Sequence, residues 1–159
     1  MKNLCLKVTI SVFFLISSAA IRAQGINQVK LAKQLAGSWT GELSKDTTIY
    51  WVIKTDGLIL DCSYKYLVKG NPIFEGKQIW NYDSKIDKYK IATTDQHIDN
   101  FVAWFTSGNK YVILSEDDIS NPERAAFRID AEFKSPDLFV QTSLANSKPI
   151  STMAYKRVK

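Results

Sequence analysis

The chain has 159 residues, with 21 Lys and Arg against 16 Asp and Glu, so its formal net charge is +5. Three of the basic residues and none of the acidic ones lie within residues 1–23, which leaves a charge of +2 on residues 24–159. A nucleic-acid-binding domain keeps a concentrated basic face, whereas here both signs alternate along the sequence. Composition and charge therefore exclude nucleic acid as the expected partner.

The start of the chain predicts a cleavable secretory signal peptide. A basic beginning is followed by the apolar run Val8–Ala20, and the small residue Ala23 follows at a plausible cleavage point. The run is shorter than the roughly 20 apolar residues of a transmembrane helix, so no membrane span is expected. We expect cleavage after about Ala23, with Ala20 as the second choice, and export to the periplasm or the extracellular space. Residues 24–159 then form a single domain.

The two cysteines are separated by this cleavage. Cys5 precedes the apolar run and is removed, whereas a lipid anchor would need a Cys at the cleavage point. Cys62 is left alone, so no internal disulfide is possible. Because it lies in an alternating apolar pattern, we expect a buried structural thiol.

The domain begins with one predicted helix and continues with strands. Residues 26–35 place Val29, Ala32 and Leu35 at near-helical spacing, and Gly37 is positioned to end the helix. Beyond it the apolar period changes to two, which is typical of strands with one buried face. Turn residues separate the strands. The predicted strands are 38–45, 47–55, 58–68, 73–82, 87–95, 100–106, 110–116, 126–134, 138–145 and 150–158.

About ten strands joined by short connections would leave long exposed edges unless the sheet closed on itself. The sequence therefore predicts an all-β fold, an up-and-down antiparallel β-barrel of about ten strands with one short N-terminal helix. The short connections favour a meander, in which each strand forms a hairpin with the next one.

Both ends of the domain carry motifs that resemble a known superfamily. The first strand contains Gly37-Ser38-Trp39, and the last strand contains Arg157. This pair resembles the calycin superfamily of lipocalins and fatty-acid-binding proteins, which implies that Arg157 lies against the Trp39 ring and closes the barrel. A cation over an indole face contributes about 0.5 to 2 kcal/mol.

A third motif strengthens the resemblance. The segment Ile79-Trp80-Asn81-Tyr82-Asp83, followed by Lys88-Tyr89, is similar to a hairpin of small secreted bacterial lipocalin-like domains of unknown function. One haem-binding branch of such barrels uses a late His as the axial ligand. Here no His follows His97, which puts haem in doubt, and no cofactor is expected.

A small barrel can hold one small ligand in its interior or mouth. The candidate binding residues lie on predicted buried faces and combine apolar area with a polar tip: Tyr64, Tyr66, Gln78, Trp80 and Tyr82. They predict a binding protein for a small apolar or amphipathic molecule. In the alternative, these side chains fill a solid core, and the protein is an interaction or structural domain that uses outward apolar residues such as Ile73 and Ile79.

An enzyme is the least favoured alternative. In an extended segment Asp95, His97 and Asp99 would share one face and could hold a metal or orient a general base, but the segment is better interpreted as a solvated loop. The acidic residues Glu116, Asp117, Asp118 and Glu123 do not match a calcium loop and are interpreted as a polar connection. No familiar catalytic motif is present, so no catalytic or metal-binding residue is predicted, and the oligomeric state stays open.

Overall fold

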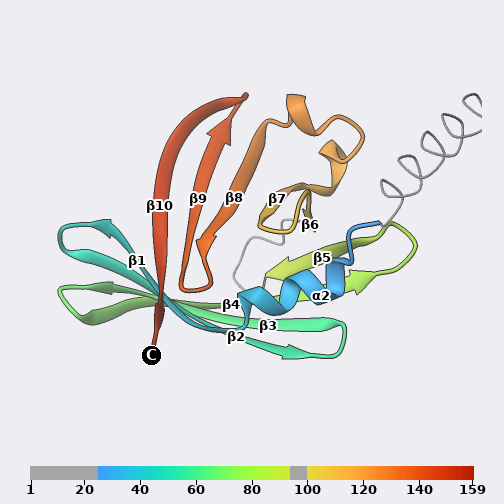
Figure 1. The fold of residues 1–159 in the computed structure, drawn as a ribbon. Helices are drawn as coiled ribbons and strands as arrows, with labels where there is room; N and C mark the ends of the chain where they lie inside the picture. The colour runs from blue at the N-terminus through green and yellow to red at the C-terminus, as the bar shows by residue number, and fades with distance from the viewer. Residues whose placement is uncertain (1–24, 94–99) are drawn as a thin grey trace, which may run out of the picture.

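The computed structural model describes residues 25–93 and 100–159, drawn in colour in Figure 1. The predicted signal peptide (1–23) and the three residues Asp95, His97 and Asp99 lie outside the described residues. Within them, no helix has the length and apolar character that crossing a membrane requires.

Ten antiparallel strands form a closed barrel, which confirms the predicted fold class. Their order around the barrel is β1-β10-β9-β8-β7-β6-β5-β4-β3-β2, so each strand pairs with its neighbours in the chain and β1 meets β10. The strands are β1 (Gly37–Ser44), β2 (Thr47–Asp56), β3 (Ile59–Val68), β4 (Asn71–Asp83), β5 (Lys88–Thr93), β6 (Phe101–Phe105), β7 (Lys110–Ser115), β8 (Phe127–Ser135), β9 (Leu138–Ala145) and β10 (Lys148–Val158).

The helix of the described residues is shorter than the predicted 26–35. Helix α2 (Gln28–Ala32) continues as the 3-10 turn η2 (Lys33–Leu35). It starts where it does because the Asn27 side chain accepts a hydrogen bond from the Lys30 N–H at 2.8 Å, as an N-cap residue does. At its end the Leu35 carbonyl accepts a hydrogen bond from the Trp39 indole at 2.8 Å. The apolar face of this helical segment closes one end of the barrel.

Aromatic rings fill the barrel next to the helix. Trp39 is fully buried, and its ring packs edge-on against Phe139 with the centroids 4.7 Å apart. Phe133 lies 5.4 Å from Phe139, and Tyr111 packs on Phe105 at the same separation. Such edge-on and tilted pairs add to the stabilisation from burial. The helical end of the barrel is therefore a packed core.

A second, smaller core lies outside the barrel. Val102, Leu114 and Ala125 are buried together, with Ile119 packed against them. Ala125 and Ile119 belong to the connection between β7 and β8, which contains the 3-10 turns η3 (Glu116–Asp118) and η4 (Pro122–Arg124). The connection is polar at its acidic residues, as predicted, but it also packs two apolar side chains against the outer face of the sheet.

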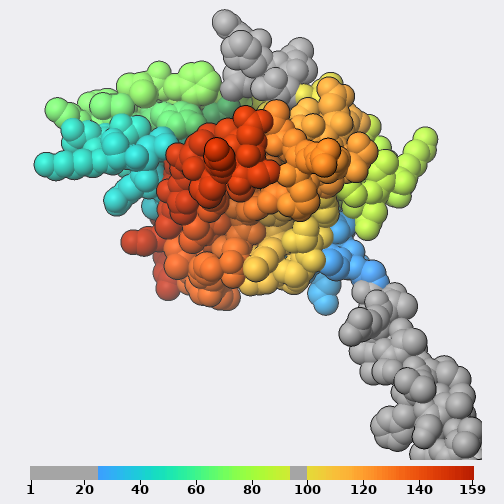
Figure 2. Space-filling view, turned by 90° about the horizontal axis from the view of Figure 1, so that it is seen from above, coloured from blue at the N-terminus to red at the C-terminus, as the bar shows by residue number. Residues whose placement is uncertain are grey.

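The barrel widens away from the helix. β1 pairs with β10 only over Ser38–Gly41 and Tyr155–Val158, although β10 begins at Lys148. Beyond Gly41 the two strands diverge, with β10 rising away from the β1–β2 hairpin in Figure 1. Seen from above, the turns of the β1–β2 and β3–β4 hairpins project beyond the body of the molecule (Figure 2). Space inside the barrel is therefore expected toward this wider end.

Candidate binding cavity

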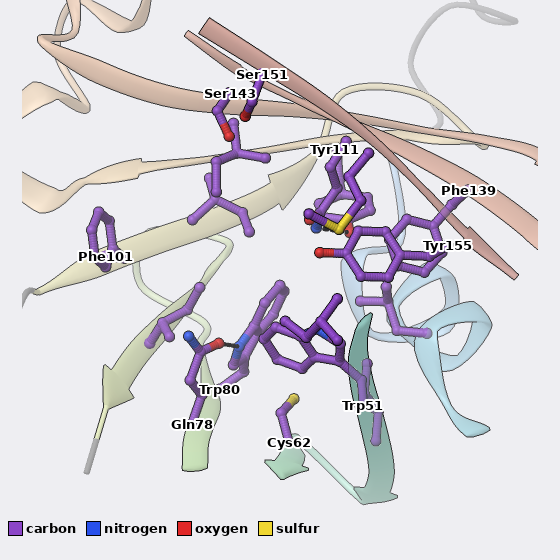
Figure 3. Close-up of a pocket in the computed structure, with 18 of the residues that line it drawn as sticks. Trp51, Cys62, Gln78, Trp80, Phe101, Tyr111, Phe139, Ser143, Ser151 and Tyr155 are labelled. Atoms are coloured by element: carbon purple, nitrogen blue, oxygen red, sulfur yellow. Dashed lines mark hydrogen bonds between the residues drawn. The ribbon is translucent and has the colours of Figure 1, made fainter. Parts of the chain in front are cut away.

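A cavity of about 350 Å³ lies inside the barrel, between the packed helical end and the wider end. Its walls come from Leu35 of η2 and from inward-facing side chains of the strands, most of them aliphatic or aromatic. Polar tips interrupt this apolar surface at a few positions, shown in Figure 3. Small-molecule sites have this composition of apolar walls with a few placed polar groups.

Three of the five predicted binding residues line the cavity, namely Tyr66, Gln78 and Trp80. Tyr64 does not line it, because its ring stacks on Trp51 at a centroid distance of 4.7 Å. Its ring also occupies the place of a side chain at Gly76, since a Cβ there would overlap the phenol. Tyr64 thus packs beside the cavity, against the lining residue Trp51.

Tyr82, the fifth predicted residue, lies nearer the helical end and does not line the cavity either. Its hydroxyl donates a 2.6 Å hydrogen bond to Asp87, and its ring packs on Tyr89 at 5.5 Å. This pairing raises the pKa of Tyr82 above its ordinary value, with the hydrogen bond to Asp87 as the main cause. The structure therefore divides the predicted set between the cavity and its surroundings.

Gln78 and Trp80 form one polar position of the wall. The Trp80 indole Nε1–H donates to Gln78 Oε1 at 3.2 Å. An indole nitrogen only donates, so it fixes which way the carboxamide is oriented. The Gln78 nitrogen then lies on the side away from Trp80, as Figure 3 shows.

A second polar position was missed by the sequence analysis. Gln141 Nε2 donates to the Tyr111 hydroxyl at 3.0 Å, and both residues line the cavity. The Tyr155 ring stacks on Phe139, with the centroids 4.6 Å apart, and its hydroxyl points into the space between the strands (Figure 3). This polar position could have been predicted from the pattern of β9, which places on one face Phe139, Gln141 and Ser143.

Two serines form a third polar position. Ser143 of β9 is paired directly with Ser151 of β10, and both line the cavity. Figure 3 shows their hydroxyls side by side, well separated from Trp80 and Gln78. The polar tips are therefore distributed over different walls.

The described lining carries no charge at neutral pH. None of the lining side chains in the described part of the chain is Asp, Glu, Lys, Arg or His. Burial raises the pKa of the Cys62 thiol to about 12, and the charge of Asp61 acts in the same direction. Burial also raises the pKa of the Tyr111 and Tyr155 hydroxyls. These groups stay protonated because a buried thiolate or phenolate would lose most of its solvation.

The barrel closure lies outside this cavity, at the helical end. The Arg157 guanidinium lies over the Trp39 ring, 4.1 Å from its centroid, and β10 pairs Arg157 directly with Trp39 on β1. The same guanidinium donates to the backbone carbonyls of Ala36, Gln34 and Pro136, at 3.1 Å for the latter two. One side chain thus joins the first strand, the last strand, the end of the helix and the β8–β9 turn.

Gly37 is part of the same arrangement. A Cβ on Gly37 would overlap the Arg157 guanidinium, and the residue has a φ of +126°. Only glycine adopts that backbone conformation without strain. The glycine of the Gly-x-Trp motif is therefore needed so that the arginine can reach its carbonyl partners.

The described residues contain no group of three or more His, Cys, Asp or Glu side chains that could hold a metal ion. Two of the four acidic residues of the β7–β8 connection are ion-paired, Glu116 with Lys90 and Glu123 with Arg128, each at 3.0 Å.

No protein-family model matches the chain, and no curated protein matches it. The closed antiparallel barrel is consistent with a lipocalin-like fold.

Proposed function

We propose that this chain is an exported lipocalin-like binding protein of the calycin superfamily, which holds a small apolar or amphipathic molecule inside its barrel. The observation that carries the proposal is the cavity of about 350 Å³ with apolar walls and a few polar tips. Its volume falls within the range of about 300 to 1,000 Å³ that small-molecule sites occupy. A fold by itself does not fix a function, so the cavity and not the barrel is the support for this proposal.

The alternatives have less support. A solid core would leave no such cavity between the walls of the barrel. Of the two outward apolar residues considered for protein contacts, Ile73 is 64% exposed but Ile79 is half-buried. The enzyme alternative depends on His97, which lies outside the described residues. Export is proposed from the sequence pattern of residues 1–23.

Two measurements test the proposal. Native mass spectrometry of protein purified from its own host should show a small molecule that co-purifies with the chain. Nile red, an uncharged solvatochromic dye, should gain fluorescence in the apo-protein and be displaced by the bound molecule.

A matched pair of variants locates the binding. Ser143→Trp places a large ring in the cavity, whereas Thr142 is its neighbour on the same strand, bonded to Thr152 on the outer face. We expect Ser143→Trp to weaken Nile red binding at least about tenfold, because the larger side chain would occupy space that the dye needs inside the barrel. Thr142→Trp should leave it unchanged. Equal effects of the two variants, or no bound molecule and no dye response, would overturn the proposal.

A further inference from the structure

We propose that the cavity selects an uncharged ligand with a hydrogen-bond acceptor oxygen, such as an alcohol, ester or ketone, and rejects the corresponding carboxylate. This inference rests on the proposed function and names the chemical class of its ligand. It follows from which polar groups the walls present and how they are oriented.

The uncharged lining disfavours an anionic ligand. A carboxylate moved out of water into an apolar site needs a cation or several donors, or the cost of burial is large. The described lining offers no cationic side chain. Arg157 is occupied by Trp39 and by backbone carbonyls at the helical end, and it does not line the cavity. Among the described residues that line the cavity, an anion would therefore find no counter-charge.

The hydrogen-bond donors of the lining favour a ligand with an acceptor atom. Because Gln78 Oε1 accepts from Trp80, the Gln78 amide nitrogen is the group left to face a ligand. On the neighbouring wall, the Trp51 indole N–H is buried and makes no hydrogen bond of standard geometry. It approaches the Tyr155 hydroxyl closely enough to act on that group's pKa, in the direction opposite to burial. Amide and indole N–H groups both call for acceptor atoms on a ligand.

Two serine hydroxyls provide a further polar position, away from Gln78 and Trp80. The Ser143 and Ser151 hydroxyls can both donate and accept. They therefore accommodate a ligand hydroxyl as well as a carbonyl. Between these polar positions, Ile91, Ile113 and Ile129 supply apolar wall. The arrangement suits an uncharged amphiphile better than either a pure hydrocarbon or an ion.

The test compares one chain length in two charge states. Displacement of Nile red by 1-decanol and by decanoic acid is measured at pH 7.5 and at pH 4. A carboxyl group has an ordinary pKa of about 4.3, so the acid is largely neutral only at the lower pH. We expect the apparent Kd of decanoic acid to be at least about tenfold higher at pH 7.5 than at pH 4, because its anion is unpaired when buried. The Kd of decanol should not change.

Variants of β4 test whether the Gln78 amide donates a hydrogen bond to the ligand. Gln78→Met keeps the side-chain length but removes the amide, and it should weaken decanol binding about three- to tenfold, the value of one hydrogen bond. Asn81→Leu, on the outer face of the same strand, is the matched control and should have no effect. Gln78→Arg supplies a cation and should raise the affinity for decanoate at pH 7.5 at least about tenfold. Melting temperatures of the three variants identify any that fails to fold.

The outcomes separate this inference from the function on which it rests. Equal affinity for decanoate and decanol at pH 7.5 overturns the inference while binding stands. Binding of Nile red without displacement by decanol also overturns it. If the dye and both amphiphiles fail to bind, the binding function itself is wrong.

Discussion

At the scale of single residues, Arg157 connects several parts of the barrel although its side chain is partly exposed. Its guanidinium contacts the Trp39 ring and backbone carbonyls of the helical end and of the β8–β9 turn, and it pairs with Asp137 at 3.3 Å. A planar guanidinium with several donors can serve such partners together, which a lysine ammonium does less well. Its aliphatic stem adds packing that is independent of charge.

Arg157→Ala should therefore lower the free energy of unfolding by about 1 to 3 kcal/mol, the usual range for losing a partly buried interaction. Lys156 is exposed on the other face of β10. Lys156→Ala should stay within about 0.5 kcal/mol of the parent. Urea melts of both variants measure the contrast. Similar losses at the two positions would show that Arg157 contributes no more than a solvated side chain.

The overlap at Gly37 provides a control for this prediction. Gly37→Ala alone should displace the guanidinium as well as strain the backbone. In the Arg157→Ala background only the strain remains, so the cost of Gly37→Ala should be smaller there. Residues in direct contact show such non-additivity in double-mutant cycles. Additive costs would place the arginine away from the glycine.

At the scale of elements, the attachment of the helix depends on one buried polar side chain. Gln28 is 5% exposed. Its amide nitrogen donates to the Phe105 carbonyl at 3.1 Å, and its oxygen accepts from the Phe105 N–H at 2.7 Å. It thus satisfies both backbone groups of the last residue of β6. A buried backbone group without a partner is costly, so this contact fixes where the helix lies against the barrel.

Gln28→Leu should cost about 2 to 4 kcal/mol, because it leaves two buried backbone groups unsatisfied at about 1 to 3 kcal/mol each, partly offset by the gain in apolar burial. Gln34 is the matched control, since it makes one exposed hydrogen bond, to the Gly108 carbonyl at 3.0 Å. Gln34→Leu should cost less than about 1 kcal/mol. Thermal and urea unfolding compare them. A cost at Gln28 no larger than at Gln34 would contradict the anchoring role.

At the scale of the whole molecule, the barrel removes several weakly acidic groups from water. Burial raises the pKa of Cys62 from 9.0 to about 12 and that of Tyr89 from 10.0 to about 12, and it raises those of Tyr111 and Tyr155 as well. In the folded protein these groups keep their protons in mildly alkaline solution. In the unfolded chain they ionise at their ordinary values.

The protein should consequently lose stability in alkali. The unfolded chain binds fewer protons than the folded one above about pH 9, so the free energy of unfolding falls as the pH rises toward 12. Each such group contributes up to about 1.4 kcal/mol per pH unit between its unfolded and folded pKa values. Below about pH 8.5 the stabilisation is fully present. Urea melts from pH 7 to pH 11, with tyrosine absorbance to follow ionisation, measure the slope.

Tyr111→Phe is the control for the alkaline slope. It removes one buried phenol, so its stability should fall less steeply than that of the parent above pH 10. The difference between the two proteins should not vary with pH below about pH 8.5. A parent protein whose stability stayed constant to pH 11 would mean that these groups ionise in the folded state.

The architecture could be predicted from the amino-acid sequence alone. Period-two alternation marks the buried face of each strand, turn residues mark where strands end, and a small domain with about ten strands closes because open edges are unfavourable. All ten predicted strands agree with the observed ones to within two residues at each end. The resemblance carried by the Gly-x-Trp motif and Arg157 also predicted that the first and last strands meet, and β1 does pair with β10 at Trp39 and Arg157. These signals are local or lie at the ends of the chain.

Which parts of the barrel interior are filled and which are hollow could not be predicted from the sequence, because this depends on packing between distant strands. Tyr64 and Tyr66 share one face of β3, and no sequence pattern separates them, yet Tyr64 packs over Gly76 while Tyr66 lines the cavity. Gln28 lies within the predicted helix 26–35, and the structure buries it against β6. Alternation tells which face a side chain occupies, but not which side chains it meets. That depends on strands far apart in the sequence, whose inward residues either touch across the barrel or leave space between them.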